Sequence, residues 1–240
     1  MNRTLEHILP RVQKPARYTG GEYNAVVKDR RAVDVRYALC FPDTYEIGMS
    51  NLGVRILYGL MNEMDGVWCE RVFAPWGDME EEMRREGIPL YGLESGDSIA
   101  DFDLIGFSLG YEMAYTNVLN MLDLAGLPLR SGERTELSPI VVAGGTCAFN
   151  PEPLAPFVDL FVLGEGENVS VEIIQLYRQA REEGWGKEEF LTAAARIPGV
   201  YVPSLYEVSY HGDGTVAAVT PLEGAPARAV SYTHLTLPTT

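Results

Sequence analysis

Five short runs of apolar residues, each bounded by turn residues, constrain the fold of this chain more than any other feature. Most residues within each run are apolar, without the regular polar alternation that marks a strand with one face in water. Such strands are typical of a parallel sheet that is covered on both faces. The runs are Val35–Phe41, Val67–Ala74, Asp103–Leu109, Pro139–Ala143 and Leu160–Leu163.

Segments with a helical spacing of apolar residues separate these runs, and helical crossovers join parallel strands. Helices are expected at Asn51–Met64, Asp78–Glu86, Tyr115–Ala125 and Val169–Glu182. We therefore predict an α/β fold: a doubly wound, Rossmann- or flavodoxin-like, mainly parallel sheet of about five strands with helices on both faces. Leu90–Leu93 is expected to form a further short strand.

The two ends of the chain carry additional elements. A short helix is expected at Leu5–Leu9 and another at Lys187–Arg196. A C-terminal β-hairpin is predicted because Leu205–Tyr210 and Thr215–Val219 flank the turn sequence His211-Gly-Asp-Gly214. The expected divisions are an N-terminal arm (1–34), the α/β domain (35–184), a helix, hairpin and linker (185–229), and a tail of different origin (230–240).

The tail from Val230 onward reads Val-Ser-Tyr-Thr-His-Leu-Thr-Leu-Pro-Thr-Thr. Ten of these residues are encoded in one frame by GTC TCT TAT ACA CAT CTG ACG CTG CCG ACG, which resembles the transposase end used in sequencing libraries. Residues 230–240 are therefore interpreted as a translated sequencing adapter and left out of the fold prediction. The natural protein is expected to continue beyond Ala229 with a domain that is absent here.

The charge and cysteine content limit the possible partners. The chain has 19 basic and 34 acidic residues, a formal net charge of −15, which does not suit non-specific binding to a nucleic-acid backbone. No apolar run approaches the roughly 20 residues that span a bilayer, and the N-terminus lacks a signal-peptide core. Cys40, Cys69 and Cys147 lie far apart in the sequence. We expect a cytoplasmic protein with free thiols, without a nucleic-acid or membrane partner.

Turns rich in glycine and small polar residues follow the predicted strands. In an open parallel sheet, ligands bind at the carboxyl ends of the strands, and glycine lets the backbone approach them closely. Turns between strands and helices also use such residues without any ligand, so no single turn decides the question. The turns are Pro42–Ser50, Ser108–Glu112, Gly144–Asn150 and Gly164–Asn168.

The order of these turns resembles the B12-binding region of radical SAM proteins. The motifs that carry the resemblance are Phe41-Pro42-Asp43…Gly48-Met49-Ser50, Gly106-Phe107-Ser108-Leu109, Ala143-Gly144-Gly145 and Asp159…Gly164-Glu165-Gly166-Glu167. Two further stretches, 8–18 and 70–76, are similar to a subfamily in which this domain is fused to a downstream radical SAM domain. The similarity covers nearly all of residues 1–229.

The resemblance implies a cofactor site but no catalytic or metal-binding residue within this chain. In such folds a Ser-x-Leu turn and a Gly-Gly turn line the slot for the cobalamin nucleotide tail. The nearest matches here are Ser108, followed by Leu109 and Gly110, and Gly144-Gly145. The residues expected to contact the cofactor are Pro42, Asp43, Gly48, Ser108, Leu109, Gly144, Gly145, Gly164, Glu165 and Gly166.

The first turn departs from the pattern of domains that ligate cobalt. Those domains carry Asp-x-His-x-x-Gly, whereas this chain has Pro42-Asp-Thr-Tyr-Glu-Ile-Gly48. His7, His211 and His234 fall outside the strand-end turns, so a histidine ligand to cobalt is not expected. The resemblance also implies a [4Fe–4S] cluster and S-adenosylmethionine in the missing domain, held by a C-x-x-x-C-x-x-C loop that we expect shortly after Arg228.

Several motifs allow a second interpretation. Gly164-Glu-Gly-Glu-Asn-Val169 follows a strand and opens a helix, but it lacks the third glycine of a dinucleotide fingerprint, and its acids suit a helix N-terminus. Asp43 and Glu46 either act together as a catalytic pair of acids or are two separate carboxylates in solvent. Cys147 lies either near a ligand or in the core. Four aromatic residues either line the wall of a pocket or pack in the core: Trp76, Tyr111, Tyr115 and Phe149.

Three functions remain open from the sequence. The chain is a domain that presents a corrinoid to the radical SAM domain, or a degenerate module that docks on that domain without a corrinoid, or a free-standing α/β enzyme. The partners expected are the missing radical SAM domain and a small-molecule corrinoid.

Overall fold

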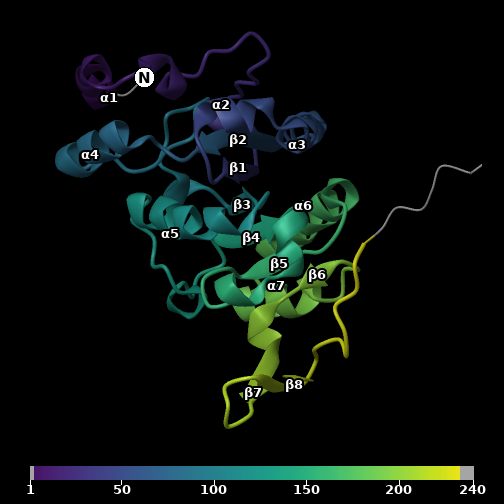
Figure 1. Ribbon diagram of the computed structural model, residues 1–240. Coiled ribbons are helices and arrows are strands. Elements are labelled where there is room, and N and C mark those ends of the chain that lie inside the picture. Colours follow the sequence, from purple (N-terminus) through teal and green to yellow (C-terminus); the bar gives the residue numbers. More distant parts are fainter. Residues whose placement is uncertain (1–2, 233–240) are drawn as a thin grey trace, which may run out of the picture.

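A mainly parallel sheet of six strands forms the centre of the molecule in the computed structural model, which describes residues 3–232 (Figure 1). The strand order is β2-β1-β3-β4-β5-β6, and only β6 runs antiparallel to its neighbour. The first five strands follow the flavodoxin-like order 2-1-3-4-5. The strands are β1 (Val35–Phe41), β2 (Val67–Phe73), β3 (Leu104–Ser108), β4 (Ile140–Gly144), β5 (Leu160–Val162) and β6 (Val200–Tyr201).

Helices cover both faces of this sheet, which confirms the predicted doubly wound α/β fold. The short α2 follows β1, and α4 and α5 pack with α1 against one face, whereas α3, α6 and α7 pack against the other (Figure 1). Among residues 3–232, no helix combines the length and apolar character that a bilayer crossing needs. The helices are α1 (Arg3–Ile8), α2 (Tyr45–Ser50), α3 (Leu52–Glu63), α4 (Gly77–Glu86), α5 (Tyr115–Leu124), α6 (Gly166–Glu183) and α7 (Lys187–Ala194).

The alternation of side chains along β1 divides the core into two clusters. Ala38 and Cys40 point to the α4 and α5 side, and Tyr37 and Leu39 point to the α3 and α6 side. All seven residues of β1 are buried, as expected for a central strand with helices on both faces.

Local signals fix where the helices begin and end. The side chain of Asn51 accepts a hydrogen bond of 3.0 Å from the Val54 amide and so caps the start of α3. Helices α4 and α6 end at Gly87 and Gly184, whose positive φ angles of 66° and 73° favour glycine.

The N-terminal arm is held against the sheet by polar contacts. The Arg71 guanidinium lies 2.6 Å from Glu22 of the arm and 2.6 Å from the buried carboxylate of Glu94. The Tyr91 hydroxyl donates to the Tyr18 carbonyl at 3.0 Å. These contacts add to the apolar packing of the arm, whose residues Leu5, Ile8, Val12 and Tyr18 are buried in the core on the α4 and α5 side.

Two elements differ from the sequence prediction. Leu90–Leu93 is not a strand: only Tyr91 pairs, in an isolated bridge to Ser98, because the Leu90 and Leu93 amides donate to Leu124 and Arg71 instead. Conversely, β6 was not predicted, since two residues are too few to show a pattern.

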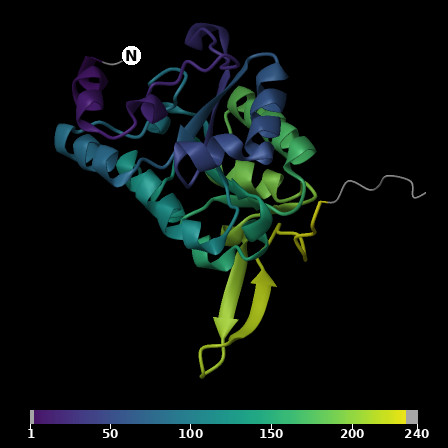
Figure 2. The same ribbon diagram turned by 45° about the horizontal axis from the view of Figure 1, so that its top comes forward.

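The predicted C-terminal hairpin is present and projects away from the sheet (Figure 2). It consists of β7 (Tyr206–Tyr210) and β8 (Val216–Pro221), and its side chains are mostly exposed. Beyond it the chain returns to the main sheet, where the Tyr232 amide donates to the Leu163 carbonyl at 2.8 Å. Of the predicted adapter tail, residues 233–240 lie outside the described residues.

Candidate functional site

A cavity of about 500 Å³ opens at the carboxyl edge of the sheet, on the side of α3 and α6. The sheet supplies one wall, and Gly53 and Leu57 of α3 face it together with the first turn of α6. We call this the carboxyl-edge cavity. The sheet residues that line it are Tyr37, Leu39, Gly106, Phe107, Ser108, Val142, Gly144 and Val162.

Six of the ten residues predicted to contact a cofactor line this one cavity. They come from the ends of three strands, which adjacent parallel pairing brings to the same edge. Ser108 pairs with Gly144 in the register of β3 and β4, although they are 36 positions apart in sequence. The six residues are Ser108, Gly144, Gly145, Gly164, Glu165 and Gly166.

The other four predicted residues do not line the cavity. Asp43 accepts hydrogen bonds of 2.6 Å from the Tyr111 hydroxyl and of 2.6 Å from the Thr44 amide. The Pro42 carbonyl accepts from the Asn117 side chain at 2.9 Å, which anchors the first turn to α5. These contacts shape the turn after β1 at a distance from the cavity wall.

Gly48 and Leu109 have packing roles. A Cβ atom at Gly48 would lie 2.2 Å from the Phe73 ring, so glycine is needed for α2 to approach β2. Leu109 is buried, and its amide donates to the Gly144 carbonyl at 2.7 Å. Its carbonyl accepts from Cys147 at 3.1 Å and lies 2.7 Å from where a Gly145 Cβ would be. Leu109 thus fixes the Gly144-Gly145 turn that lines the cavity.

The pattern of the strand-end turns gave no sign of Tyr37, which lies deep in the cavity wall. The side chain crosses Gly106 of the neighbouring strand, where an added Cβ would be 1.9 Å from the tyrosine hydroxyl. Tyr37 is 5% exposed, and burial raises its pKa. The sequence carries no signal for this pair, because the diagonal placement of Tyr37 and Gly106 follows from the register of β1 and β3.

The start of α6 faces the same cavity and bears two carboxylates. Glu165 and Glu167 line it next to Gly166, and the Glu165 amide donates to the Tyr232 carbonyl at 3.0 Å. These acids favour the positive end of the helix and repel a pyrophosphate. The two carboxylates therefore disfavour dinucleotide binding at this turn.

Exposed apolar side chains surround the carboxyl edge. Each of the turns after β1, β2, β3 and β4 presents at least one, and α3 adds two near its start. A single exposed apolar residue is ordinary, but a set on one edge marks a surface that a ligand or partner covers. We call this set the apolar rim; it comprises Ile47, Leu52, Ile56, Trp76, Tyr111, Met113 and Phe149.

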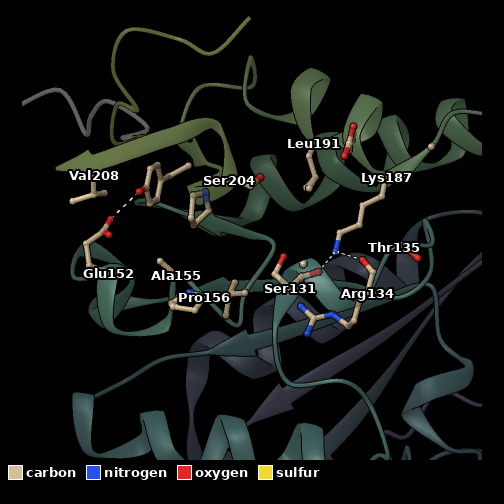
Figure 3. Close-up of a pocket in the computed structure, with 16 residues that line it drawn as sticks. Ser131, Arg134, Thr135, Glu152, Ala155, Pro156, Lys187, Leu191, Ser204 and Val208 are labelled. Atoms are coloured by element: carbon tan, nitrogen blue, oxygen red, sulfur yellow. Dashed lines mark hydrogen bonds between the residues drawn. The ribbon is translucent and has the colours of Figure 1, made fainter. Parts of the chain in front are cut away.

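A second cavity, of about 640 Å³, lies at the opposite edge of the sheet, between α7, the base of the hairpin and the segments that precede β4 and β5 (Figure 3). Lys187 reaches down from α7 and donates to the carbonyls of Ser131 and Arg134 at 2.9 and 2.6 Å. We call this the amino-edge cavity. It was not predicted from the sequence.

The charged groups beside the amino-edge cavity are paired with one another. Asp159, directly before β5, lies 2.7 Å from Lys187 and 3.1 Å from Arg134, and it also accepts from the Ser131 hydroxyl. Burial lowers the pKa of Lys187, and the nearby Asp159 opposes that shift. The Arg134 Nε has no partner among the described residues, but it is closed off from solvent and so from any ligand. These groups hold the chain together at this edge.

The candidate acids and thiols have structural surroundings. Glu46 lies 2.8 Å from Arg17 and 3.1 Å from Lys14, and mainly the bond from Arg17 lowers its pKa to about 2. It is therefore not paired with Asp43. Cys147 is buried in the core cluster on the α4 and α5 side, and burial raises its thiol pKa. Within residues 3–232, no cluster of three or more histidine, cysteine or acidic side chains is placed to hold a metal ion.

Comparison with known proteins gives a family match and one distant relative. The family model described as "Radical SAM proteins, N-terminal" matches residues 53–203, which is more than half of the chain. An uncharacterized protein of Methanocaldococcus jannaschii is 27% identical over 148 residues. The aligned part is 61% of this chain and 28% of that protein, so the chain spans less than a third of this relative's length.

Proposed function

The chain belongs to the N-terminal family of radical SAM proteins, and from this premise we propose that its carboxyl-edge cavity holds the nucleotide tail of a corrinoid. One observation carries the proposal: Ser108, Gly144 and Gly164, from the ends of three different strands, line a single cavity at the carboxyl edge. Ligands of open α/β sheets bind at this edge.

The residues around the cavity suit a flat, largely apolar group. Leu57 on one side and Val142 and Val162 on the other present aliphatic surface. Gly106 and Gly144 have no side chain that would fill the space above the sheet. A cavity of about 500 Å³ is within the roughly 300–1,000 Å³ of small-molecule sites. A tail base fits between these walls, with the rest of the corrinoid outside.

Two of the turns at the mouth have a role in this proposal. The Ser108 hydroxyl is available to donate to or accept from the ribose or phosphate of the tail. Gly145, with a φ of 100°, lets the backbone turn without a side chain in the opening. The apolar rim would contact the corrin ring or the domain that covers it, which would remove its exposed side chains from water.

The chain's own residues limit what is proposed for the metal chemistry. A bound corrinoid supplies a cobalt centre that carries methyl groups or electrons. None of the described residues that line the cavity is a histidine, so this chain is not proposed to ligate cobalt. Because Cys40, Cys69 and Cys147 are all buried and dispersed, we propose that a [4Fe–4S] cluster and S-adenosylmethionine belong to a further domain of the same protein.

A titration with hydroxocobalamin tests the proposal. The 240-residue chain is expected to retain one equivalent through gel filtration and to change the cobalamin absorbance spectrum. Gly144→Val, which extends a side chain into the slot, is expected to weaken binding at least tenfold. Gly59→Ala is the matched control, because a Cβ there meets nothing within 4 Å and lies outside the cavity. No retained corrinoid at high micromolar concentration would contradict the proposal.

The apolar rim supports a second candidate, a docking module that contacts the radical SAM domain without any corrinoid. Its exposed side chains would be covered by protein alone. This candidate gains if the chain binds no corrinoid while an added radical SAM domain from the same protein forms a stable complex with it.

A further inference from the structure

The Tyr37 hydroxyl is placed in the carboxyl-edge cavity by two features of the sheet. The side chain of Tyr37 points to the α3 and α6 side of β1, within the second core cluster. Gly106 on β3 then leaves space for the phenol to cross the neighbouring strand. Any side chain at position 106 would occupy the place of this hydroxyl.

This hydroxyl differs from those of the other buried tyrosines. Tyr91 donates to the Tyr18 carbonyl at 3.0 Å, Tyr177 to Asp103 at 2.8 Å and Tyr201 to Glu152 at 2.7 Å. Tyr18 and Tyr58 accept hydrogen bonds from the amides of Trp76 and Val26. Within residues 3–232, no hydrogen-bond partner is found for Tyr37: the residue is 95% buried, but its hydroxyl is not closed off and opens onto the cavity.

A hydroxyl that opens onto a cavity bonds to water there until a group of a ligand replaces the water. Burial raises the pKa of Tyr37, which keeps it protonated at neutral pH and makes it a hydrogen-bond donor. The neighbouring lining residues Leu39, Val142 and Leu57 carry no side-chain acceptor. An acceptor atom on a bound ligand is thus the partner that this hydroxyl would gain when the ligand displaces water.

The depth of Tyr37 indicates which part of the ligand reaches it. The hydroxyl lies over Gly106, two residues before the end of β3 at Ser108, roughly 7 Å inside the edge of the sheet at the usual rise of a strand. The ribose and phosphate of the tail are assigned to Ser108 at this edge, so the base is the part that lies further inside. Its ring nitrogen is free to accept a hydrogen bond when it does not coordinate cobalt.

We propose that Tyr37 donates a hydrogen bond to the ring nitrogen of the lower base, so that the cavity selects corrinoids whose tail ends in a nitrogen heterocycle. This inference rests on the proposed function and adds the class of corrinoid that the site takes. A corrinoid with a phenolic lower base lacks the acceptor nitrogen, and cobinamide lacks the tail.

The test compares the affinities of wild type and Tyr37→Phe for cobalamin, a phenolic cobamide and cobinamide, measured by absorbance titration. Tyr37→Phe is expected to weaken cobalamin binding about tenfold, the effect of one lost hydrogen bond, and to leave the other two affinities unchanged. The bound cobalamin is expected to show the spectrum of cobalt without a nitrogen lower ligand. Tyr91→Phe is the control, since its hydroxyl is paired on the other face.

Thermal unfolding distinguishes a role of the Tyr37 hydroxyl in ligand binding from a role in the stability of the fold. Tyr37→Phe is expected to melt at or above the wild-type temperature because the hydroxyl that it removes has no protein partner, whereas Tyr91→Phe is expected to melt lower. Equal cobalamin affinity in wild type and Tyr37→Phe, or a clearly lower melting temperature for Tyr37→Phe, would overturn this inference and leave the proposed function standing. A wild-type chain that binds none of the three corrinoids would overturn the proposed function itself.

Discussion

The two cavities at opposite edges of the sheet differ in what their polar groups bond to. At the amino edge, Asp159, Arg134 and Lys187 are buried and bond to one another and to nearby carbonyls. At the carboxyl edge, the glycines leave the walls open and the Tyr37 hydroxyl has no partner among the described residues. The amino-edge cavity is the larger, at about 640 against 500 Å³.

This difference shows that volume alone does not identify a ligand site. Hydrogen-bonding groups that are already paired gain little from a ligand, because a new bond must replace an old one. A hydroxyl that opens onto a cavity and has no protein partner is free to bond to a ligand, unlike Arg134 Nε, which is closed off. The smaller cavity is therefore the better candidate for binding, and the larger one has a structural role.

The largest effect is expected from breaking the amino-edge network. Asp159→Ala would leave Lys187 and Arg134 buried without their counter-charge and is expected to lower the free energy of unfolding by about 3–5 kcal/mol. Urea unfolding measures this loss. The control is Glu188→Gln, which alters an exposed side chain at the same cavity and is expected to change stability by less than about 0.5 kcal/mol. If Asp159→Ala stays folded but loses corrinoid binding, the division of roles between the cavities is wrong.

A smaller loss is expected from Gly106→Ala. The added Cβ would lie 1.9 Å from the Tyr37 hydroxyl, and this overpacking is expected to cost about 1–3 kcal/mol. Corrinoid affinity should fall as well, since the phenol is displaced into the slot. Gly59→Ala, inside α3, should instead raise stability by about 0.5–1 kcal/mol. Equal stability of the two variants in urea unfolding would show that Tyr37 has room to move.

These two predictions also mark how far the sequence was informative. The continuous apolar runs are local signals, so β1 to β5 and the glycine turns after them were found at nearly their true positions. The pairing of Tyr37 with Gly106 depends on the lateral register of β1 and β3, which no local pattern records. Arg134, Asp159 and Lys187 are well separated in sequence and looked like ordinary surface charges until the fold brought them together.

Removing residues 230–240 is expected to have a moderate effect on binding. The Tyr232 carbonyl lies over Gly164, where a Cβ would come within 2.0 Å of it, and Tyr232 lines the cavity. A ligand that enters fully must displace this segment, so its removal is expected to increase corrinoid affinity by up to about tenfold. Absorbance titration of the 1–229 chain measures the change. Weaker binding by this shortened chain would mean that the segment forms part of the site.

The smallest effect is expected from the exposed ion pair near the carboxyl edge. Because Arg17 lowers the pKa of Glu46 to about 2, the pair stabilises the fold above the ordinary carboxylate pKa and loses this contribution as the pH falls from about 4.5 to 2. Glu46→Gln removes this part of the acid dependence. The difference in unfolding free energy between wild type and Glu46→Gln should shrink from pH 5 to pH 2; a difference that grows would have the wrong sign for this pair.

Hydrogen–deuterium exchange with and without cobalamin tests the assignment of the two edges most directly. The account predicts slower exchange on binding at residues 106–109, 142–146 and 162–170, and no change at residues 131–135 and 186–191. Protection confined to the second group, or spread equally over both, would contradict it.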